Sequence, residues 1–228
     1  MCILSYVPTN DGFVLTFNRD EVYNRQTKAP KYYTIDNQQL VFPKDIKYGG
    51  SWIGINETRS VVGCMLNAKG KSPKIPSKSR GVIFIDNLIR GGVNLNENEL
   101  RHIAPFTLLF FYVQSQVVVK YYWDGIDLKR ENNPMSSPLV LCSSSLYTEA
   151  IISELREEFK NQISDKSEVE NTTSSFHKKC LFYKNHPIYL KKNSDIQTVS
   201  ITTILKNKKG FTLTYADLQE NTEQTIPL

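Results

Sequence analysis

The run MCILSYVPTNDGFVLTFNRDE, residues 1–21, decides the fold that we expect for this chain. Its first part, Cys2 to Val7, is apolar and partly β-branched, and it leads into Thr9-Asn10-Asp11-Gly12, a strong turn signal. A second apolar stretch, Phe13 to Asn18, follows the turn. The pattern predicts a β-hairpin made by the first residues of the chain.

The register of this hairpin brings polar residues to the start of the chain. The second strand ends on four consecutive polar residues, Asn18, Arg19, Asp20 and Glu21. If the turn centres near Asn10, paired positions sum to roughly 20 or 21, so Cys2 lies opposite Asn18 or Arg19. We therefore expect the four polar side chains close to Cys2. A solvated strand exit would explain the same four residues without any chemistry.

Cys2 becomes a candidate nucleophile if Met1 is removed. The new α-amine, with a pKa of about 7.7–8, would then accept the proton of the thiol on the same residue. Arg19 beside the thiol would stabilise a thiolate, and the Asp20 carboxylate would hold the amine. Asn18 would donate to a developing oxyanion. The alternative is that Cys2 is a buried strand residue with a packing role.

The composition is that of a globular protein. The chain has 228 residues, of which 40% are hydrophobic and 22% are charged, and we find no repeat or linker that divides it. We therefore expect one domain over residues 1–228. The net charge is only +5, and the lysines are scattered apart from the loop Lys69–Arg80. This balance suits an anionic ligand and argues against nucleic-acid binding.

The cysteines argue against a metal or disulfide framework. None of Cys2, Cys64, Cys142 and Cys180 forms a C-x-x-C pair. His177 and Cys180 have no further ligand at a suitable spacing, so we expect no metal and no cofactor. No apolar stretch is long enough to span a membrane. These features predict a soluble, cytoplasmic protein with free thiols, in which Cys2 is partly accessible and more reactive than Cys64 or Cys142.

Short strands dominate the remaining sequence. They are predicted at Ser60–Met65, Phe106–Val113, Val117–Tyr122, Pro138–Cys142, Thr198–Leu205 and Phe211–Tyr215. Because these runs are almost continuously apolar, we expect the sheets to be covered on both faces.

Two helices are predicted between the strands. One runs over Gly81–Arg90, with Ser79 as N-cap and Gly91-Gly92 as its end, and the other runs over Thr148–Asn161. The polar stretch Ser164–Ser175 is predicted to be a mobile loop, and Lys69–Ser79 a second loop. Strands at both ends of the chain with helices between them predict layered sheets clad by helices.

Several motifs resemble the NRDE family, that of the transport and Golgi organisation proteins. They are Met1-Cys2-Ile3, Asn18-Arg19-Asp20-Glu21, Gly49-Gly50-Ser51-Trp52-Ile53-Gly54, Asn67, Ser79-Arg80-Gly81 and Ser200-Ile201-Thr202-Thr203-Ile204-Leu205 before Gly210. The resemblance spans nearly the whole chain. It implies an α+β fold like that of the N-terminal-nucleophile (Ntn) hydrolases: a four-layer αββα sandwich with two stacked, mostly antiparallel sheets flanked by helices.

The resemblance adds substrate-binding candidates to the N-terminal residues. They are Glu21, Gly50, Trp52, Asn67 and Arg80. The two glycines before Trp52 indicate a close backbone approach or a turn, with Trp52 either a core residue or a pocket wall. Asn67 is either a turn residue or a ligand of a carbonyl oxygen. Arg80, at the end of the basic loop, is either solvated or an anion contact near a helix N-terminus.

Two functions remain open at this point. The first is an N-terminal-cysteine hydrolase that acts on a linear amide through Cys2, Asn18, Arg19 and Asp20. The second, which the family resemblance implies, is a non-catalytic binding or trafficking protein for haem, acyl-CoA or another amphipathic anionic ligand. The fold does not decide between them.

Overall fold

The computed structural model describes residues 2–145, 147–163, 169–180 and 195–228. Their contacts group the chain into two compact units: Met1–Asn24 with Ser137–Leu228, and Arg25–Ser136. The single domain expected from the sequence stays a prediction. None of the described helices is long and apolar enough to cross a membrane.

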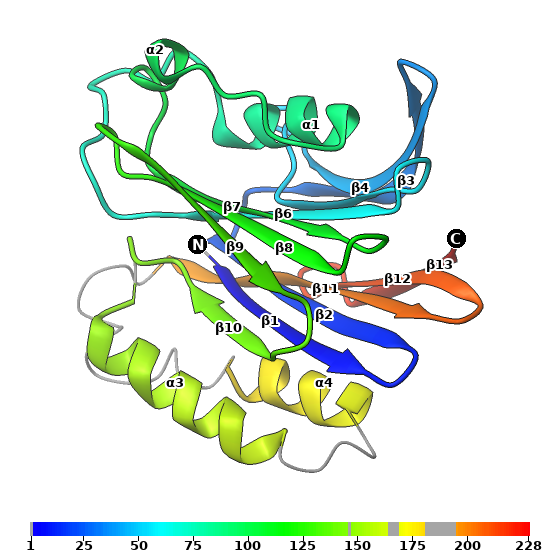
Figure 1. Ribbon diagram of the computed structural model, residues 1–228. Coiled ribbons are helices and arrows are strands. Elements are labelled where there is room, and N and C mark those ends of the chain that lie inside the picture. The colour runs from blue at the N-terminus through cyan, green and yellow to red at the C-terminus, as the bar shows by residue number, and fades with distance from the viewer. Residues whose placement is uncertain (1, 146, 164–168, 181–194) are drawn as a thin grey trace. The chain divides into compact units, whose positions relative to one another are not determined.

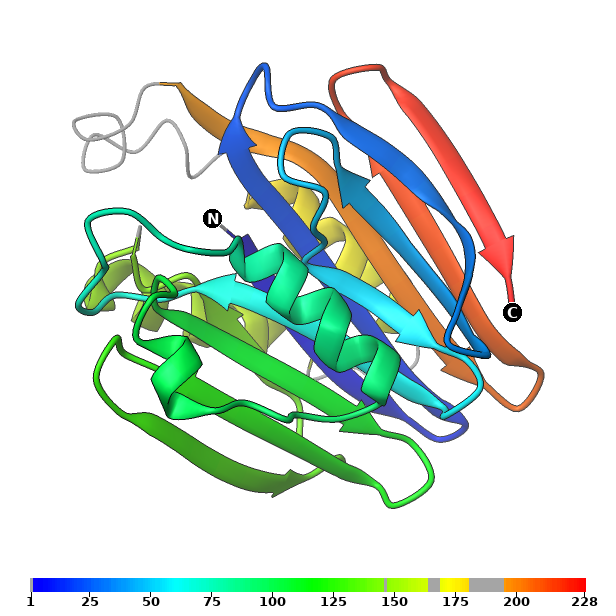
Figure 2. The same cartoon turned by 90° about the horizontal axis from the view of Figure 1, so that it is seen from above.

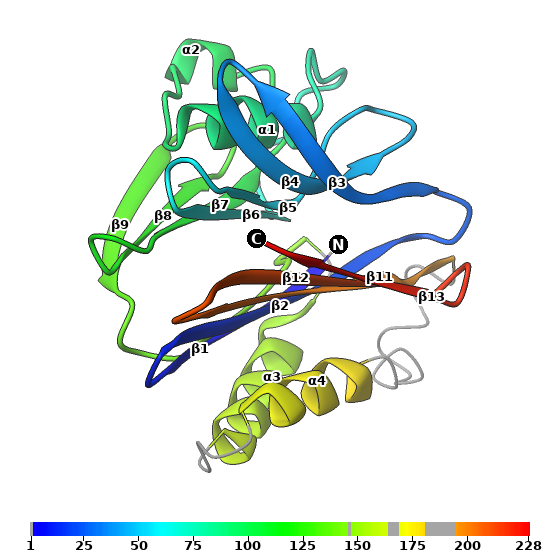
Figure 3. The same ribbon diagram turned by 90° about the vertical axis from the view of Figure 1, so that its right-hand side faces the viewer.

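The first unit is a six-stranded antiparallel sheet with two helices on one face (Figures 1 and 3). Its elements are β1 Cys2–Thr9, β2 Gly12–Val22, β10 Leu139–Cys142, α3 Glu149–Gln162, α4 Val169–Lys179, β11 Ile196–Asn207, β12 Gly210–Asp217 and β13 Thr222–Pro227. The strand order is β10-β1-β2-β11-β12-β13. The N-terminal hairpin therefore lies in the middle of this sheet.

The hairpin register matches the prediction. Cys2 pairs with Arg19 and Ile3 with Asn18, and the turn falls between Thr9 and Gly12. The residues Cys2–Val7 and Phe13–Asp20 contain no exposed or half-exposed side chain. Since successive side chains of a strand point to opposite faces, both faces of these central strands are buried, as predicted.

Helix α3 confirms the predicted apolar stripe. Ile151, Ile152, Leu155 and Phe159 are buried in a core that they share with Ile3, Val7 and Val14 of the hairpin. The N-cap is Thr148, whose side chain accepts a hydrogen bond from the backbone of Ile151. This helix therefore covers the face of the sheet toward which odd-numbered β1 residues and even-numbered β2 residues point.

The predicted loop over Ser164–Ser175 is wrong in its second half. Residues 164–168 lie outside the described part, but Val169–Lys179 form α4. Val169, Thr173, Phe176 and His177 are buried along one side of this helix. The spacing of these four residues is helical. The sequence did not reveal it because the segment is rich in Ser and Thr, and Phe176 alone provides most of its apolar surface.

The second unit is a seven-stranded antiparallel sheet with helix α1 against one face (Figure 2). Its elements are β3 Thr27–Ile35, β4 Gln38–Asp45, β5 Ile53–Asn56, β6 Val61–Asn67, α1 Arg80–Arg90, α2 Glu97–Leu100, β7 Phe106–Tyr112, β8 Val117–Trp123 and β9 Leu128–Pro134. The strands follow one another in sequence order from β3 to β9. Phe84 and Leu88 of α1 are fully buried in the core of this unit.

Helix α1 ends as predicted. Gly91 caps it in the left-handed region, with φ at 65°, where a residue with a Cβ is strained. Ser79 holds the N-cap position, but its side chain makes no capping hydrogen bond. Instead, the backbone N–H of Ser51, just before β5, donates a 3.0 Å hydrogen bond to the Gly81 carbonyl in the first turn of the helix.

Gly50 needs to be a glycine because of this close approach. A Cβ built on it would lie 2.5 Å from the backbone carbon of Gly81, a distance that only a backbone shift could relieve. Gly49 has φ at 70° in the turn that precedes it. Both predictions for the glycine pair, a turn and a close backbone approach, are therefore confirmed.

Five strands escaped the sequence analysis. They are β3, β4, β5, β9 and β13. Four of them carry many polar or exposed residues: β9, for example, is exposed along almost its whole length. Edge strands such as β3, β9 and β13 have few buried side chains. The alternating apolar pattern that marks a strand is therefore weak there.

Candidate functional site

The run Asn18–Glu21 divides between the two faces of the first sheet. Asn18 and Asp20 point to the face that α3 and α4 cover, because they alternate with residues such as Phe17 and Arg19 on the other face. Cys2 pairs directly with Arg19, so its side chain also lies on the face away from the helices. The four polar residues therefore do not form one cluster of side chains.

The backbone of Cys2 is held by Ser143. The Cys2 nitrogen donates to Ser143 Oγ at 2.8 Å, and Ser143 N donates to the Cys2 carbonyl at 2.9 Å. Ser143 directly follows strand β10 and is fully buried. This pair fixes the position of the Cys2 nitrogen, the atom that becomes the α-amine when Met1 is removed. No motif distinguishes Ser143 from the serines that follow it, so its role could not be predicted from the sequence.

Cys2 is less accessible than predicted. Its side chain is only 6% exposed, and burial raises the pKa of its thiol above the ordinary value. The Asp20 carboxylate also raises this pKa, while the Arg19 cation lowers it. The expectation of a partly accessible cysteine is therefore wrong. Arg19 acts in the predicted direction, but desolvation outweighs it.

Asn18 is bound to a histidine of α4. Its Nδ2 donates to the His177 carbonyl at 3.0 Å, and its Oδ1 lies 2.7 Å from His177 Nδ1. The other ring nitrogen, Nε2, lies 2.7 Å from Ser5 Oγ. All three residues are completely buried. They form a polar chain from β2 through α4 to β1 beneath the Cys2 end of the sheet.

His177 is neutral in this environment. Burial lowers its pKa to about 3, because a cation in the core would lose its hydration. The neutral ring suits the contacts that it makes, since one nitrogen donates and the other accepts. We infer that Asn18 Oδ1 accepts from Nδ1–H and that Ser5 Oγ donates to Nε2.

Asp20 links the same strand to α3 and β11. Its Oδ2 accepts from the Tyr147 hydroxyl at 2.6 Å, and its Oδ1 accepts from Thr198 Oγ1 at 2.5 Å. Asp20 is 1% exposed, so these two bonds replace much of the hydration that the carboxylate loses. Tyr147 comes just before α3, and Thr198 pairs with Asp20 in the sheet. Sequence analysis assigned no role to either residue.

The face that carries Cys2 and Arg19 extends to Ser200 on β11. Ser200 pairs with Arg19, and a register shift between Thr198 and Ser200 sets this alignment. The Ser200 hydroxyl is buried, and it has no hydrogen-bond partner among the described residues. Cys2, Arg19 and Ser200 thus form a row across three strands. Ser200 belongs to the motif that the sequence analysis placed in the closing hairpin.

The substrate-binding candidates of the second unit gather at one end of its sheet. Arg80 Nη1 donates to the Pro105 carbonyl at 2.9 Å, and Ala68 N, next to Asn67, donates to the same oxygen. Trp52 is 8% exposed, so it is a core residue of this region. Gly50 lies against Gly81, the neighbour of Arg80. The expectation that these residues share a cavity with Cys2 stays a prediction.

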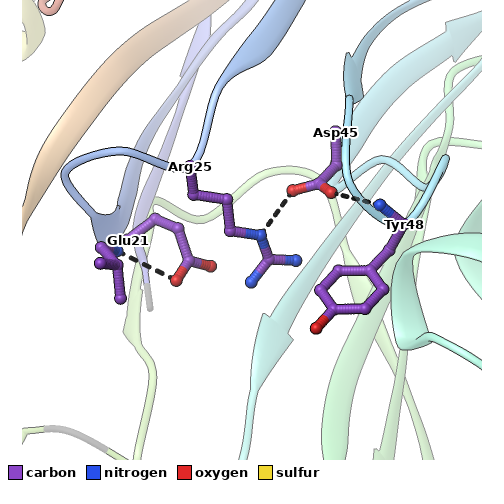
Figure 4. Close-up of polar contacts among 5 residues, drawn as sticks. Glu21, Arg25, Asp45 and Tyr48 are labelled. Atoms are coloured by element: carbon purple, nitrogen blue, oxygen red, sulfur yellow. Dashed lines mark hydrogen bonds and ion pairs between the residues drawn. The ribbon is translucent and has the colours of Figure 1, made fainter.

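An ion pair supports the turn before Trp52. In Figure 4, Arg25 Nε donates to Asp45 Oδ2 at 2.7 Å, while Tyr48 N donates to the second oxygen at 2.8 Å. The guanidinium carbon lies 4.8 Å from the centre of the Tyr48 ring. Asp45 N also donates to the Gly50 carbonyl, so this cluster closes the turn that positions Gly50. Sequence analysis missed both Arg25 and Asp45.

Glu21 ends the polar run next to a surface hollow. Its Oε1 accepts from the backbone nitrogen of Val22 at 3.0 Å, as Figure 4 also shows. The hollow that begins one residue further along has a volume of about 590 Å³ and is open to solvent. It is lined by Val22, Tyr23, Asn24, Asp195 and Gln197. None of the residues predicted for the site lines this hollow, although it continues from the same end of β2.

The described residues contain no cluster of three or more His, Cys, Asp or Glu side chains that could hold a metal ion. His177 and Cys180, the pair weighed from the sequence, are both buried in the core under the sheet. Cys180 packs with Cys142 and Phe176 there, and burial raises the pKa of both thiols, that of Cys142 to about 12. Both thiols therefore pack in the core of the first unit.

Comparison with known structures defines the class of the fold. The chain resembles a crystal structure of a variant of the conjugated bile acid hydrolase from Clostridium perfringens, with a TM-score of 0.51 and 12% sequence identity. The match covers 99% of this chain and 92% of that chain. The fold is therefore that of the Ntn hydrolases, as predicted.

The family follows from the sequence. The model of the family described as Transport and Golgi organisation 2 matches residues 1–209, and the chain belongs to this family. The resemblance to the NRDE proteins is thereby confirmed. No curated protein matches the chain in sequence.

Proposed function

We propose that this protein is an N-terminal-cysteine hydrolase that cleaves a linear amide, with Cys2 as the nucleophile. The observation that carries the proposal is the fixed position of the Cys2 nitrogen, 2.8 Å from Ser143 Oγ, on the strand that pairs with Arg19. A nucleophile and its base on the same residue need this kind of positioning, because the amine must lie close to both the thiol and the substrate.

The chemistry begins with the removal of Met1. The α-amine of Cys2 takes the thiol proton, and the sulfur attacks the carbonyl carbon of the amide. The carbon–nitrogen bond breaks, and the proton held by the amine passes to the leaving nitrogen. Water then hydrolyses the thioester, which gives a carboxylic acid and restores the thiol.

A local base is needed because the Cys2 thiol is buried. Burial raises its pKa, so the thiolate is scarce at neutral pH unless a neighbour removes the proton. Arg19 opposes this effect by favouring the negative charge. We assign to Arg19 the stabilisation of the thiolate and of charge on the substrate.

Asn18 and Asp20 take positioning roles in this proposal. Their side chains are bound to His177, Tyr147 and Thr198 on the helix-covered face. They hold β2, and through it Arg19, in register with Cys2. An oxyanion donor would then come from a backbone N–H or from another side chain, in place of the Asn18 amide considered from the sequence.

The substrate class rests on the fold and on charge. The structural neighbour is named for the hydrolysis of conjugated bile acids, so an amide with an amphipathic acyl part is the reaction that we transfer to this chain. The positive net charge of +5 suits an anionic group on such a molecule.

A second function is favoured by two observations. Cys2 is only 6% exposed. The hollow beside Glu21 has a volume of about 590 Å³ and is lined by both apolar and polar side chains. Its apolar side chains, Val22 and Tyr23, suit the apolar part of an amphipathic ligand such as haem or acyl-CoA, although none of its five lining residues is a cation for the anionic group. In this alternative the protein carries the ligand and Cys2 performs no chemistry.

The test combines mass, turnover and binding. Intact mass of the purified protein should lack Met1. Turnover of a panel of N-acyl amino acids should fall by more than about a thousandfold in Cys2→Ala, because the nucleophile is lost. Cys142→Ala is the matched control: this cysteine lies on the neighbouring strand, facing the helices, and should leave turnover unchanged. Ser143→Ala should shift the pH profile of turnover, since the amine loses its partner.

Two results would contradict the proposal of an N-terminal-cysteine hydrolase. One is Met1 retained in a protein that still turns the amides over. The other is no turnover by the wild type, together with binding of haemin or acyl-CoA that Cys2→Ala leaves intact and that Tyr23→Ala weakens. That second result would establish the carrier.

A further inference from the structure

The loop Lys69–Arg80 carries the most exposed large apolar side chain among the described residues. Ile75 is 86% exposed, and its neighbours Lys74 and Pro76 are exposed as well. The side chain therefore protrudes from the surface and does not line a groove. A single exposed isoleucine is ordinary on a protein surface, so the residues around Ile75 decide whether it has a partner.

The surroundings of Ile75 are cationic. The loop contains Lys69, Lys71, Lys74, Lys78 and Arg80 and no acidic residue. Lys78 pairs with Asp86, and Arg80 bonds the Pro105 carbonyl, but Lys71 and Lys74 form no ion pair with any described residue. Positive charge therefore remains available on the N-terminal side of the isoleucine.

The loop is braced against the turn between β8 and β9. Lys71 N donates to the Asp124 carbonyl at 2.7 Å, and the Tyr122 hydroxyl donates to the Lys69 carbonyl at 2.9 Å. A Cβ on Gly125 would lie 1.8 Å from the Lys71 carbonyl, so the two backbones touch. Pro73 and Pro76 further restrict the chain. The loop thus presents its side chains without a large loss of entropy on binding.

The same turn carries a second protruding isoleucine. Ile126 is 61% exposed and follows Gly125, the residue in contact with Lys71. This turn carries Lys129 but also the carboxylates of Asp124 and Asp127, so the cations of the surface come from the loop Lys69–Arg80. Two exposed isoleucines thus lie on adjoining segments of a surface with several cations.

We propose that this surface, formed by Lys69–Arg80 and Asp124–Lys129, docks the protein on an anionic lipid membrane. The isoleucines enter the acyl boundary and the lysines contact the headgroups. A bilayer suits these side chains better than a protein partner does, because a protruding apolar residue needs a pocket on a protein but none on a membrane. The docking is peripheral and independent of the hydrolase proposed above.

The test is flotation of the purified full chain with vesicles. Vesicles of phosphatidylcholine with phosphatidylserine should carry the protein upward, while phosphatidylcholine alone should not. Ile75→Asp should weaken binding more than about tenfold, because the apolar side chain that enters the membrane is replaced by a charge. Ile46→Asp is the matched control: that isoleucine is 48% exposed on another loop, and its change should have no effect.

Lysine variants test the electrostatic contribution to membrane binding. Lys71→Gln and Lys74→Gln should each weaken binding about fivefold, and added salt should reduce it further. Ile75→Trp should show a blue shift of fluorescence with anionic vesicles. All these positions are exposed, so the variants should fold normally.

Three results would overturn the proposal. They are no flotation with anionic vesicles, binding that is equal on neutral vesicles, and binding that depends on the lysines but survives Ile75→Asp. The last result would mean a simple charged surface, and equal retention of the protein on heparin or RNA would then identify its partner as an anionic polymer.

Discussion

The two faces of the first sheet differ at the end where Cys2 lies. On the helix-covered face, Asn18 and Asp20 are buried and bonded to His177, Tyr147 and Thr198. On the opposite face, Cys2 and Arg19 lie side by side with the Ser200 hydroxyl, which lacks a partner among the described residues. One polar run of the sequence thus serves two purposes, because strand alternation sends neighbours to opposite sides.

We interpret the two faces as having different roles, stability on the helix-covered face and reactivity on the face that carries Cys2. A buried polar group that has its hydrogen bonds stabilises one arrangement of strands and helices, and its removal leaves the partners unsatisfied. The buried Ser200 hydroxyl, which has no hydrogen-bond partner among the described residues, is available for a ligand. We therefore expect changes on the helix-covered face to affect stability, and changes on the other face to affect reactivity.

The largest effect on stability is expected for Asp20→Ala. The change leaves the hydroxyls of Tyr147 and Thr198 without their acceptor in the core, and we expect a loss of about 3–5 kcal/mol in the free energy of unfolding. The neighbouring carboxylate gives the control. Glu21 is half-buried, whereas Asp20 is only 1% exposed, so Glu21→Ala should cost less than about 1 kcal/mol. Urea titrations followed by circular dichroism measure both, and equal losses would break the distinction between the faces.

An effect of intermediate size is expected from His177 in acid. Its folded pKa of about 3 lies below the ordinary value, so the unfolded chain takes up the proton first. The stabilisation is complete above about pH 6.5 and is lost as the pH falls toward about 3. Between pH 7 and pH 5 the free energy of unfolding should fall by about 2 kcal/mol from this group.

His177→Gln isolates that contribution. Other groups titrate in both proteins, so the difference between the two pH slopes belongs to His177. The variant should be less stable at pH 7 but should lose less stability on acidification. Parallel slopes would mean that the ring is not held neutral in the core.

The smallest effect is expected for Arg19→Ala, which tests the face that carries Cys2. Because burial raises the Cys2 pKa, iodoacetamide should label Cys2 in the native protein more than about a hundredfold more slowly than in the urea-unfolded chain at neutral pH. Labelling should accelerate as the pH rises. Arg19→Ala should slow it further, since the cation lowers the pKa. Fast native labelling of Cys2, ahead of half-buried Cys142, would show that the thiol is activated after all.

Local signals in the sequence were sufficient for the hairpin and for two helices. The Thr9–Gly12 turn sets the pairing of Cys2 with Arg19, since turn length fixes register. The apolar stripe of α3 and the glycine after α1 set those helices in the same way. Strands such as β3 and β9 were missed because their polar, exposed residues give little alternation.

The partners of the site residues could not be predicted, because they come from distant parts of the chain. Asn18 and His177 are 159 residues apart, Asp20 and Tyr147 are 127 apart, and Cys2 and Ser143 are 141 apart. A serine, tyrosine or histidine has no local pattern that reveals such a contact. α4 in particular was taken for a loop because its Ser and Thr residues conceal the buried face that ends at His177.

By itself, the sequence determined the N-terminal hairpin, its register and the resemblance to the family, because turns, periodicity and motifs are properties of neighbouring residues. Only the tertiary structure decided that Asn18 and Asp20 hold helices while Arg19 faces the Cys2 thiol, and that this thiol is buried with a raised pKa. The physical reason is that burial and hydrogen-bond partners are set by the packing of α3, α4 and β11 on the hairpin. Those segments lie more than a hundred residues away in the chain.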